Sequence, residues 1–212
     1  MIFNNNILYN WWKNIDKAIL FLISLLFVLG LFFSLVSTSF IASDKLNTNS
    51  YFFFIKHLIF VSLGIIVLLI FSFLNRRTLI YLSIALFILF TLFLILVPFF
   101  GIEVKGSRRW MDIGPLPRFQ PIELLKPFFI ILISYFLFTN KDKNKYLNYF
   151  LSSFIVLPII LLLIAQPDIG QTLLITMIWL SIIFVSGINL AVFFSFFLFF
   201  GSSIFLLVTY FP

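Results

Sequence analysis

The sequence has 212 residues, of which 63% are hydrophobic and only 10% are charged. A soluble domain cannot hide that much apolar surface, and several uncharged runs exceed the length needed to cross a bilayer. The composition therefore excludes a soluble globular protein and predicts an all-α polytopic membrane protein. The net charge is +7, but the basic residues cluster in short loops between apolar runs, which indicates topology and contact with membrane lipids, not nucleic-acid binding. Cysteine is absent and His57 is the one histidine, which argues against disulfides and against thiolate or histidine metal sites.

The apolar runs predict seven spanning helices in a single transmembrane domain over residues 1–212. Before the first run, Trp11 and Trp12 lie close to Lys13 and Lys17, a composition typical of side chains that anchor a helix at the membrane interface. The predicted spans are residues 18–41, 57–74, 78–100, 121–138, 146–165, 169–186 and 190–211.

The distribution of basic residues predicts the orientation of these spans. With the N-terminus in the cytoplasm, the loop at residues 105–126 and the polar turn at residues 165–170 both fall on the outer side of the membrane. Apart from that loop, seven basic residues are then inside and two outside: Lys13, Lys17, Arg76, Arg77, Lys141, Lys143 and Lys145 against Lys45 and Lys56.

The loop at residues 105–126, KGSRRWMDIGPLPRFQPIELLK, lies between two apolar runs and carries seven charged residues. Charged side chains at membrane depth are costly, which makes them candidates for function. Pro121 suits the first turn of a helix, where Glu123 is favoured by the helix dipole. Glu123 and Lys126 are three residues apart and can pair on one face. Two interpretations stay open, an ion pair at the outer rim near the headgroups or a polar cavity that opens to the outer leaflet.

The arginines of this loop suggest recognition of phosphate. Arginine presents a planar fork of donors that matches phosphate, and Arg108, Arg109 and Arg118 lie within eleven residues of one another, counted from Arg108 to Arg118. Trp110 could lie at the headgroup level or stack on a sugar. Attraction to phospholipid headgroups is the alternative explanation for the arginines.

The second polar segment, AQPDIG at residues 165–170, interrupts another apolar run. Asp168 could cap a helix at this break, a position that aspartate favours. It could also pair with Lys126 or Arg109 across the bundle, since a lone carboxylate in hydrocarbon is expensive.

Taken together, these residues resemble the SEDS family of bacterial cell-wall proteins, and its division branch more than its elongation branch. The resemblance extends over essentially the whole chain in span order. Ile122 is a departure, because the family usually has Ser or Ala there and the larger side chain could crowd the entrance of a cavity. The matching residues are Gly106-x-x-Arg109-Trp110, Gly114, Gln120-Pro121-x-Glu123-x-x-Lys126 and Gln166-Pro167-Asp168-x-Gly170.

The resemblance implies a bundle of about ten spanning helices, of which about seven are present. It also implies a peptidoglycan glycosyltransferase that polymerises lipid II at the outer face of the cytoplasmic membrane, at the division septum, with a class B penicillin-binding protein and other division proteins as partners. No cofactor is expected, although the acidic groups could hold a divalent cation. The residues implied to line the substrate cavity are Arg109, Trp110, Gln120, Glu123, Lys126, Gln166 and Asp168, supported by Arg108, Pro121 and Gly170.

The aspartate to which the family's catalytic role is assigned lies in an outer loop after the seventh span. We therefore expect the catalytic residue downstream of Pro212, and we expect this chain to be an N-terminal portion that is inactive alone. Two alternatives remain, a lipid II flippase and a non-enzymatic division scaffold. A flippase should need a polar path deep into the inner half of the bundle, where the first three spans offer only a few serines.

Overall fold

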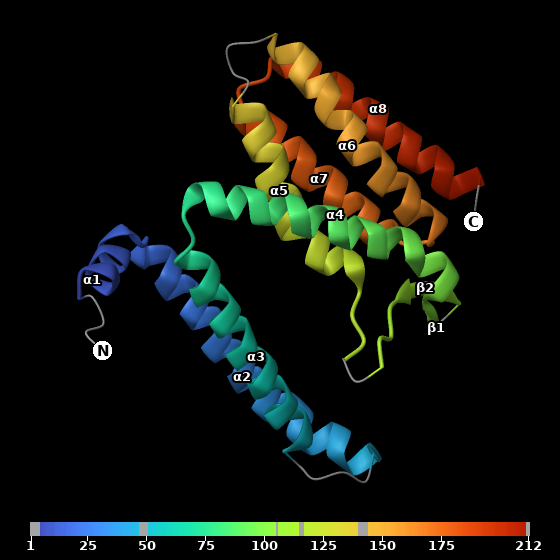
Figure 1. The fold of residues 1–212 in the computed structure, drawn as a ribbon. Helices are drawn as coiled ribbons and strands as arrows, with labels where there is room; N and C mark the ends of the chain where they lie inside the picture. The colour runs from blue at the N-terminus through green and yellow to red at the C-terminus, as the bar shows by residue number, and fades with distance from the viewer. Residues whose placement is uncertain (1–4, 47–50, 105, 115–116, 140–143, 211–212) are drawn as a thin grey trace. The chain divides into compact units, whose positions relative to one another are not determined.

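The computed structural model describes residues 5–46, 51–104, 106–114, 117–139 and 144–210, which form eight helices and one two-stranded sheet (Figure 1). The helices are α1 (Asn5–Asn14), α2 (Lys17–Leu46), α3 (Phe52–Ser72), α4 (Arg76–Phe100), α5 (Pro121–Thr139), α6 (Lys145–Ala165), α7 (Ile169–Val185) and α8 (Leu190–Tyr210). In the described part of the chain, five helices, α2 to α6, are long and apolar enough to cross a membrane, and α7 and the Leu190–Ser203 part of α8 are shorter apolar segments. The predicted helical membrane architecture is confirmed. Lys105, Lys141 and Lys143 lie outside the described residues.

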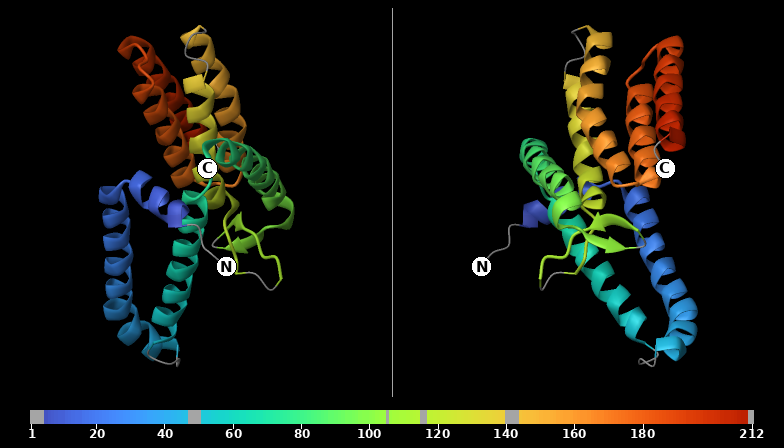
Figure 2. Two further views of the ribbon diagram at one scale, coloured as in Figure 1. Left: turned by 60° about the vertical axis from the view of Figure 1, so that its left-hand side comes forward. Right: turned by 90° about the vertical axis from the view of Figure 1, so that its right-hand side faces the viewer.

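The chain forms two compact units, Met1–Asn75 and Arg76–Pro212. In the first unit, α2 and α3 form a long antiparallel pair (Figure 2). Most of their apolar side chains are exposed, and α3 has no buried residue among those described. Asp16 starts α2, because its Oδ1 accepts the backbone N–H groups of Ala18 and Ile19 at 2.9 and 3.1 Å, satisfying donors that a helix leaves unpaired in its first turn.

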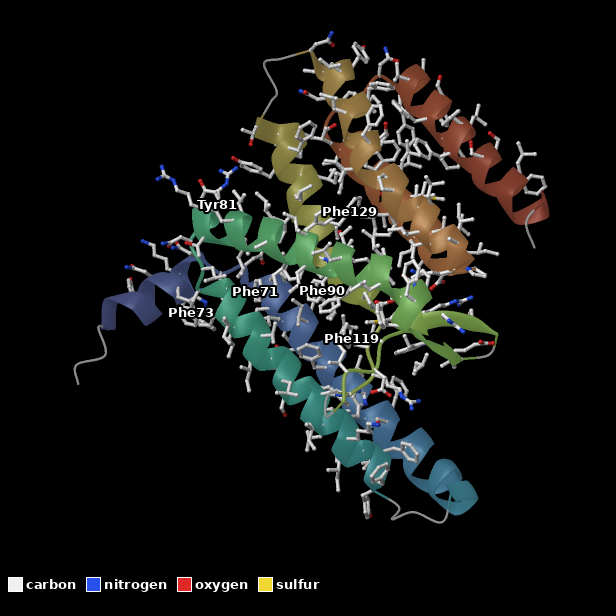
Figure 3. The ribbon with its side chains drawn as sticks, turned by 45° about the vertical axis from the view of Figure 1, so that its right-hand side comes forward. Phe71, Phe73, Tyr81, Phe90, Phe119 and Phe129 are labelled. Atoms are coloured by element: carbon white, nitrogen blue, oxygen red, sulfur yellow. The ribbon has the colours of Figure 1, made fainter. Side chains whose placement is uncertain are left out.

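The second unit is a helical bundle. Helices α5, α6 and α7 pack side by side, α8 packs on α7, and α4 crosses α5 obliquely (Figures 1 and 2). The core lies between α5, α6 and α7, where Phe129, Ile159, Ile175 and Trp179 have 0–1% of their surface exposed. Phe129 also faces α4 (Figure 3), so one apolar core holds these helices together and fixes the positions of their ends.

A β-hairpin that the sequence did not predict follows α4. Strand β1 (Ile102–Val104) pairs antiparallel with β2 (Ser107–Trp110), and Val104 pairs with Ser107 across a two-residue turn. Gly106, the second residue of this turn, has a φ of +80°, which glycine adopts without the steric cost that a side chain would bring.

A further pair of backbone hydrogen bonds closes the segment between the hairpin and α5. The N–H of Met111 donates to the carbonyl of Phe119 at 2.9 Å, and the N–H of Phe119 donates back at 3.2 Å. The Phe119 ring packs edge-on against Phe93 of α4 (Figure 3). These contacts hold the residues just before α5 against the end of α4.

Candidate functional site

The two polar segments meet at one end of the bundle. Arg109, on β2, reaches the turn between α6 and α7, where its Nη1 lies 3.6 Å from Asp168 Oδ1. Its Nε donates to the carbonyl of Gln166 at 3.4 Å and its Nη2 donates to the carbonyl of Pro167. The side chain of Asp168 is 6% exposed and that of Arg109 is 33% exposed. Arg109 therefore fastens the hairpin to the start of α7 through an ion pair that is buried on its acidic side.

Asp168 has the two roles that the sequence left open. Its Oδ1 accepts the backbone N–H of Gln171 at 3.4 Å, a long contact at the N-terminus of α7. Its Oδ2 accepts the side-chain amide of Gln120 at 2.8 Å. With the Arg109 ion pair, these contacts provide three partners for a carboxylate that is almost closed to solvent, and so offset the cost of its burial.

Gln166 is used inside the fold. Its side chain is 4% exposed, and its Nε2 donates to the carbonyl of Leu94 in α4 at 3.0 Å. We expected Gln166 to line a cavity, and the structure instead places its amide on the α4 backbone. It supports the turn that carries Asp168.

A second cluster of charged and polar side chains, Glu123, Lys126 and Gln171, lies on the first two turns of α5 and the first turn of α7. Lys126 Nζ is 2.6 Å from Glu123 Oε2 and donates to Gln171 Oε1 at 3.2 Å, and Gln171 Nε2 donates to Glu123 Oε1 at 2.6 Å. The Lys126 side chain is 15% exposed and that of Glu123 is 49% exposed. The predicted pairing of Glu123 with Lys126 is present, on the helix face that their spacing indicates.

Gln171 links the Arg109–Asp168 pair to the Lys126–Glu123 pair. The sequence analysis did not single out this residue. Its backbone contacts Asp168, and its side chain contacts both Glu123 and Lys126. A signal was available, because Gln171 follows Asp168 by three residues and would lie in the first turn of any helix that Asp168 caps.

The remaining arginines of the loop pair locally. Arg118 Nε donates to Asp112 Oδ2 at 3.0 Å. Arg108 lies 3.9 Å from Glu103, its partner across the hairpin, and donates to the carbonyl of Pro98 at 3.4 Å. Each arginine described in this loop thus has a carboxylate partner, so the positive charge that suggested phosphate recognition is balanced locally. Trp110 is exposed on β2.

Pro121, Ile122 and Gly170 have simpler roles. Pro121 is buried and begins α5, the position predicted from its missing N–H. Ile122 is fully buried in the core, where it packs among apolar side chains. A Cβ placed on Gly170 would meet no heavy atom within 4 Å, so packing does not require glycine there.

Among the residues that the structure describes, the acidic side chains do not gather into a metal site. In the described ranges no group of three His, Cys, Asp or Glu side chains lies close enough to hold a metal ion. Asp168 and Glu123 are each engaged by a cationic side chain. This set of donors does not fit Mg²⁺ or Ca²⁺, which take six or more oxygen ligands.

The fold and the site define a polytopic helical membrane protein with a charged network where a hairpin meets the first turns of two helices. Residues 16–211 match the family model of cell cycle proteins named for FtsW, RodA and SpoVE. The chain belongs to this family, and the predicted SEDS membership is confirmed.

Solved structures and curated relatives agree with this assignment. RodA of Thermus thermophilus, a rod shape determining protein, superposes with a TM-score of 0.70 at 26% identity, over 89% of this chain and 60% of RodA. A chain from a peptidoglycan synthase complex gives a TM-score of 0.66 at 29% identity, over 83% of this chain and 49% of that chain.

Two relatives are each named probable peptidoglycan glycosyltransferase FtsW. The protein from Caulobacter vibrioides is 28% identical over 85% of this chain and 46% of its own length. The protein from Buchnera aphidicola subsp. Acyrthosiphon pisum is 34% identical over 84% of this chain and 45% of its own length. This chain therefore spans less than half the length of these curated relatives.

Proposed function

We propose that this chain is part of a peptidoglycan glycosyltransferase that polymerises lipid II during cell division. Membership of the family and similarity to FtsW proteins support this assignment. The observation that carries it is the network in which Arg109–Asp168 and Lys126–Glu123 are joined through Gln171. Such a network holds two cations in fixed positions at one end of the bundle, which is what an anionic leaving group needs.

The proposed reaction forms a glycosidic bond between a hydroxyl oxygen of the acceptor sugar and the anomeric carbon of the donor. The bond from that carbon to the pyrophosphate breaks, and the polyprenyl pyrophosphate leaves with the electron pair. Arg109 and Lys126 stabilise the charge that develops on the pyrophosphate. Trp110, exposed on the hairpin, supplies a face on which a sugar can stack.

The acceptor hydroxyl gives its proton to a general base, which we place outside these 212 residues. Asp168 is 6% exposed and holds three donors, so it is a positioning residue for Arg109 and for α7. Glu123 holds Lys126 and Gln171 in the same way. Because the chain covers less than half of the FtsW relatives, we assign the activity to a protein of their length.

We also propose that the N-terminus lies in the cytoplasm and the network on the outer face of the cytoplasmic membrane, at the division septum, with a class B penicillin-binding protein as partner. The excess of basic residues in the predicted inner loops supports this orientation. The contact between both polar segments agrees with helix counting, which places them on one side of the membrane in either orientation.

The test is polymerisation of lipid II in proteoliposomes that contain a class B penicillin-binding protein. The chain alone is compared with a chimera that adds the part of the Buchnera relative beyond the matched region. We expect polymer from the chimera only. Lys126→Ala and Arg109→Ala should each lower its rate by roughly a hundredfold, the loss typical when one preorganised donor is removed.

Arg118→Ala is the matched control, since it removes an arginine whose carboxylate pair is exposed, and the rate should stay within about twofold. Polymer made by the chain alone would refute the requirement for further residues. An unchanged rate in a folded Lys126→Ala chimera would refute the role of the network.

The flippase and scaffold alternatives have separate signatures. Buried polar side chains do follow α6 and α7, but Thr172 and Thr176 donate to carbonyls of their own helix, and Ser152 bonds to Trp179 and its own helix. They provide packing contacts, not a free polar path.

Fluorescent lipid II that crosses the bilayer without polymer formation would favour a flippase. Lost partner recruitment with normal polymer yield in Lys126→Ala would favour a scaffold.

A further inference from the structure

The N-terminal helix α1 is fastened to the end of α3. Trp11 Nε1 donates to Ser72 Oγ at 2.9 Å, and the Trp11 ring stacks on Phe73 with centroids 4.9 Å apart and planes 16° apart. In the ribbon views α1 lies across the end of the α2–α3 pair, and Phe73 lies where α1 meets α3 (Figures 2 and 3). One tryptophan therefore fixes α1 against the end of two apolar spans.

The opposite face of α1 has no protein cover within this unit. Tyr9 is 66% exposed and Trp12 is 51% exposed, and their spacing of three places them on one side of the helix. Lys13 and Lys17 are exposed beside them, and Lys17 Nζ lies 5.7 Å from the centre of the Trp12 ring. Aromatic rings with lysines at the end of a span are the composition of a membrane–water interface.

A cavity of about 430 Å³ is lined by residues of α1 and of the segment at the end of α3. Its lining includes three asparagines, Asn10, Asn14 and Asn75, together with the aromatic residues Trp11 and Phe73. Each amide offers donors and an acceptor, and the cavity lies at the level where the apolar helices α2 and α3 begin and end. This combination of donors and an apolar wall suits the phosphate and glycerol of a phospholipid headgroup.

We propose that α1 is an interfacial helix and that, with the end of α3, it binds the headgroup of an anionic phospholipid. Charge favours an anionic lipid, because Lys13 lies in the last turn of α1 and Lys17 begins α2. Asp16, the acidic residue between them, is engaged with the backbone of α2. A lysine close to an anionic surface contributes about fivefold in binding at low ionic strength.

The chain lacks cysteine, so Tyr9→Cys creates a single site for an environment-sensitive fluorophore. The labelled full chain is placed in nanodiscs of phosphatidylcholine, with or without phosphatidylglycerol. We expect an apolar environment for the probe with phosphatidylglycerol. Lys13→Gln with Lys17→Gln should weaken this partition by about thirtyfold at low salt, and Lys145→Gln, at the start of α6, should leave it unchanged. A water-exposed probe in both lipids, or one indifferent to the paired substitution, would overturn the proposal.

The cavity itself is tested by native mass spectrometry of the unlabelled chain with phosphatidylglycerol. Asn10→Asp keeps the shape of the side chain but places a negative charge in the cavity, so retention of the lipid should fall severalfold. Asn144→Asp makes the same change before α6 and should retain the lipid. Equal retention in both variants would refute the headgroup site. Displacement of the lipid by inorganic phosphate would identify a simple anion site. Retention of a peptide instead of lipid would identify a protein-docking surface. Either result would overturn the proposal.

Discussion

Asp168 is the residue whose replacement tests the network most directly. Asp168→Asn keeps the shape of the side chain and one side-chain oxygen, which can still cap α7, since asparagine caps a helix about as well as aspartate. It removes the charge that faces Arg109, and its NH2 group takes the place of the oxygen that accepts the Gln120 amide, so Gln120 has to turn its own amide oxygen toward that group to keep the contact. Asp168→Ala removes all three contacts, so the difference between the two variants separates the ion pair from the hydrogen bonds.

The structure gives the magnitudes. At the 3.6 Å separation of Arg109 and Asp168, an effective dielectric constant of about 20 gives a gross attraction of about 4–5 kcal/mol. Arg109 keeps the carbonyls of Gln166 and Pro167 as acceptors, so Asp168→Asn should lower the free energy of unfolding by only about 1–3 kcal/mol. Asp168→Ala also loses the cap and leaves the Gln120 amide unpaired, which adds about 2 kcal/mol.

The assay is reversible unfolding in mixed micelles, followed by circular dichroism, with a double-mutant cycle against Arg109→Gln. The coupling energy should be about 1–3 kcal/mol, as for residues that share one polar network. The control is the cycle of Asp112→Asn with Arg118→Gln, whose ion pair is exposed and should couple by less than about 1 kcal/mol. Additivity of the Arg109 and Asp168 substitutions to within about 0.3 kcal/mol would refute the ion pair as a source of stability.

The same unfolding assay checks four other substitutions. Gly101→Ala should destabilise the fold by roughly 1–3 kcal/mol, because its Cβ would lie 2.4 Å from the carbonyl oxygen of Val97, whereas Gly170→Ala, in open space, should change stability by less than about 0.5 kcal/mol. Ser83→Ala should stabilise by about 1 kcal/mol, because this buried hydroxyl has no partner among the described residues. Trp179→Phe loses a buried hydrogen bond of 3.0 Å and should cost about 1 kcal/mol. The opposite sign in any of them would contradict the packing described.

The location of the two polar segments at the same end of the bundle could be predicted, because it depends only on counting spans. An apolar run of about twenty residues has few alternatives to a membrane helix. Each span reverses the side of the membrane, so residues 105–126 and 165–170 had to fall on the same side. Glu123 and Lys126 could be paired for a similar reason, because helical periodicity places residues three apart on one face.

The details of the network could not be predicted, because they depend on the hairpin. Residues 102–110 form only short strands, too short to be recognised by alternation, yet β2 is what carries Arg109 to Asp168. The local pairing of Arg108 with Glu103 also needs the register of that hairpin. Gln166 was expected to line a cavity. Its direction toward α4 depends on tertiary packing, which its neighbours in sequence do not indicate.

Charge balance in the network limits how an anionic substrate could bind at the proposed site. Arg109 and Lys126 each face a carboxylate, so a pyrophosphate would have to share the cation with that carboxylate or displace it.

The two ion pairs differ in how easily a substrate could displace the carboxylate. Glu123 is 49% exposed and can turn toward solvent, whereas Asp168 is 6% exposed and is held by Gln120 and the start of α7. Lys126 is therefore the cation that a substrate can take over at lower cost, while Arg109 keeps the hairpin in place. On this reasoning Glu123→Gln should tighten the binding of an anionic headgroup, whereas Asp168→Asn should loosen the hairpin before it affects binding.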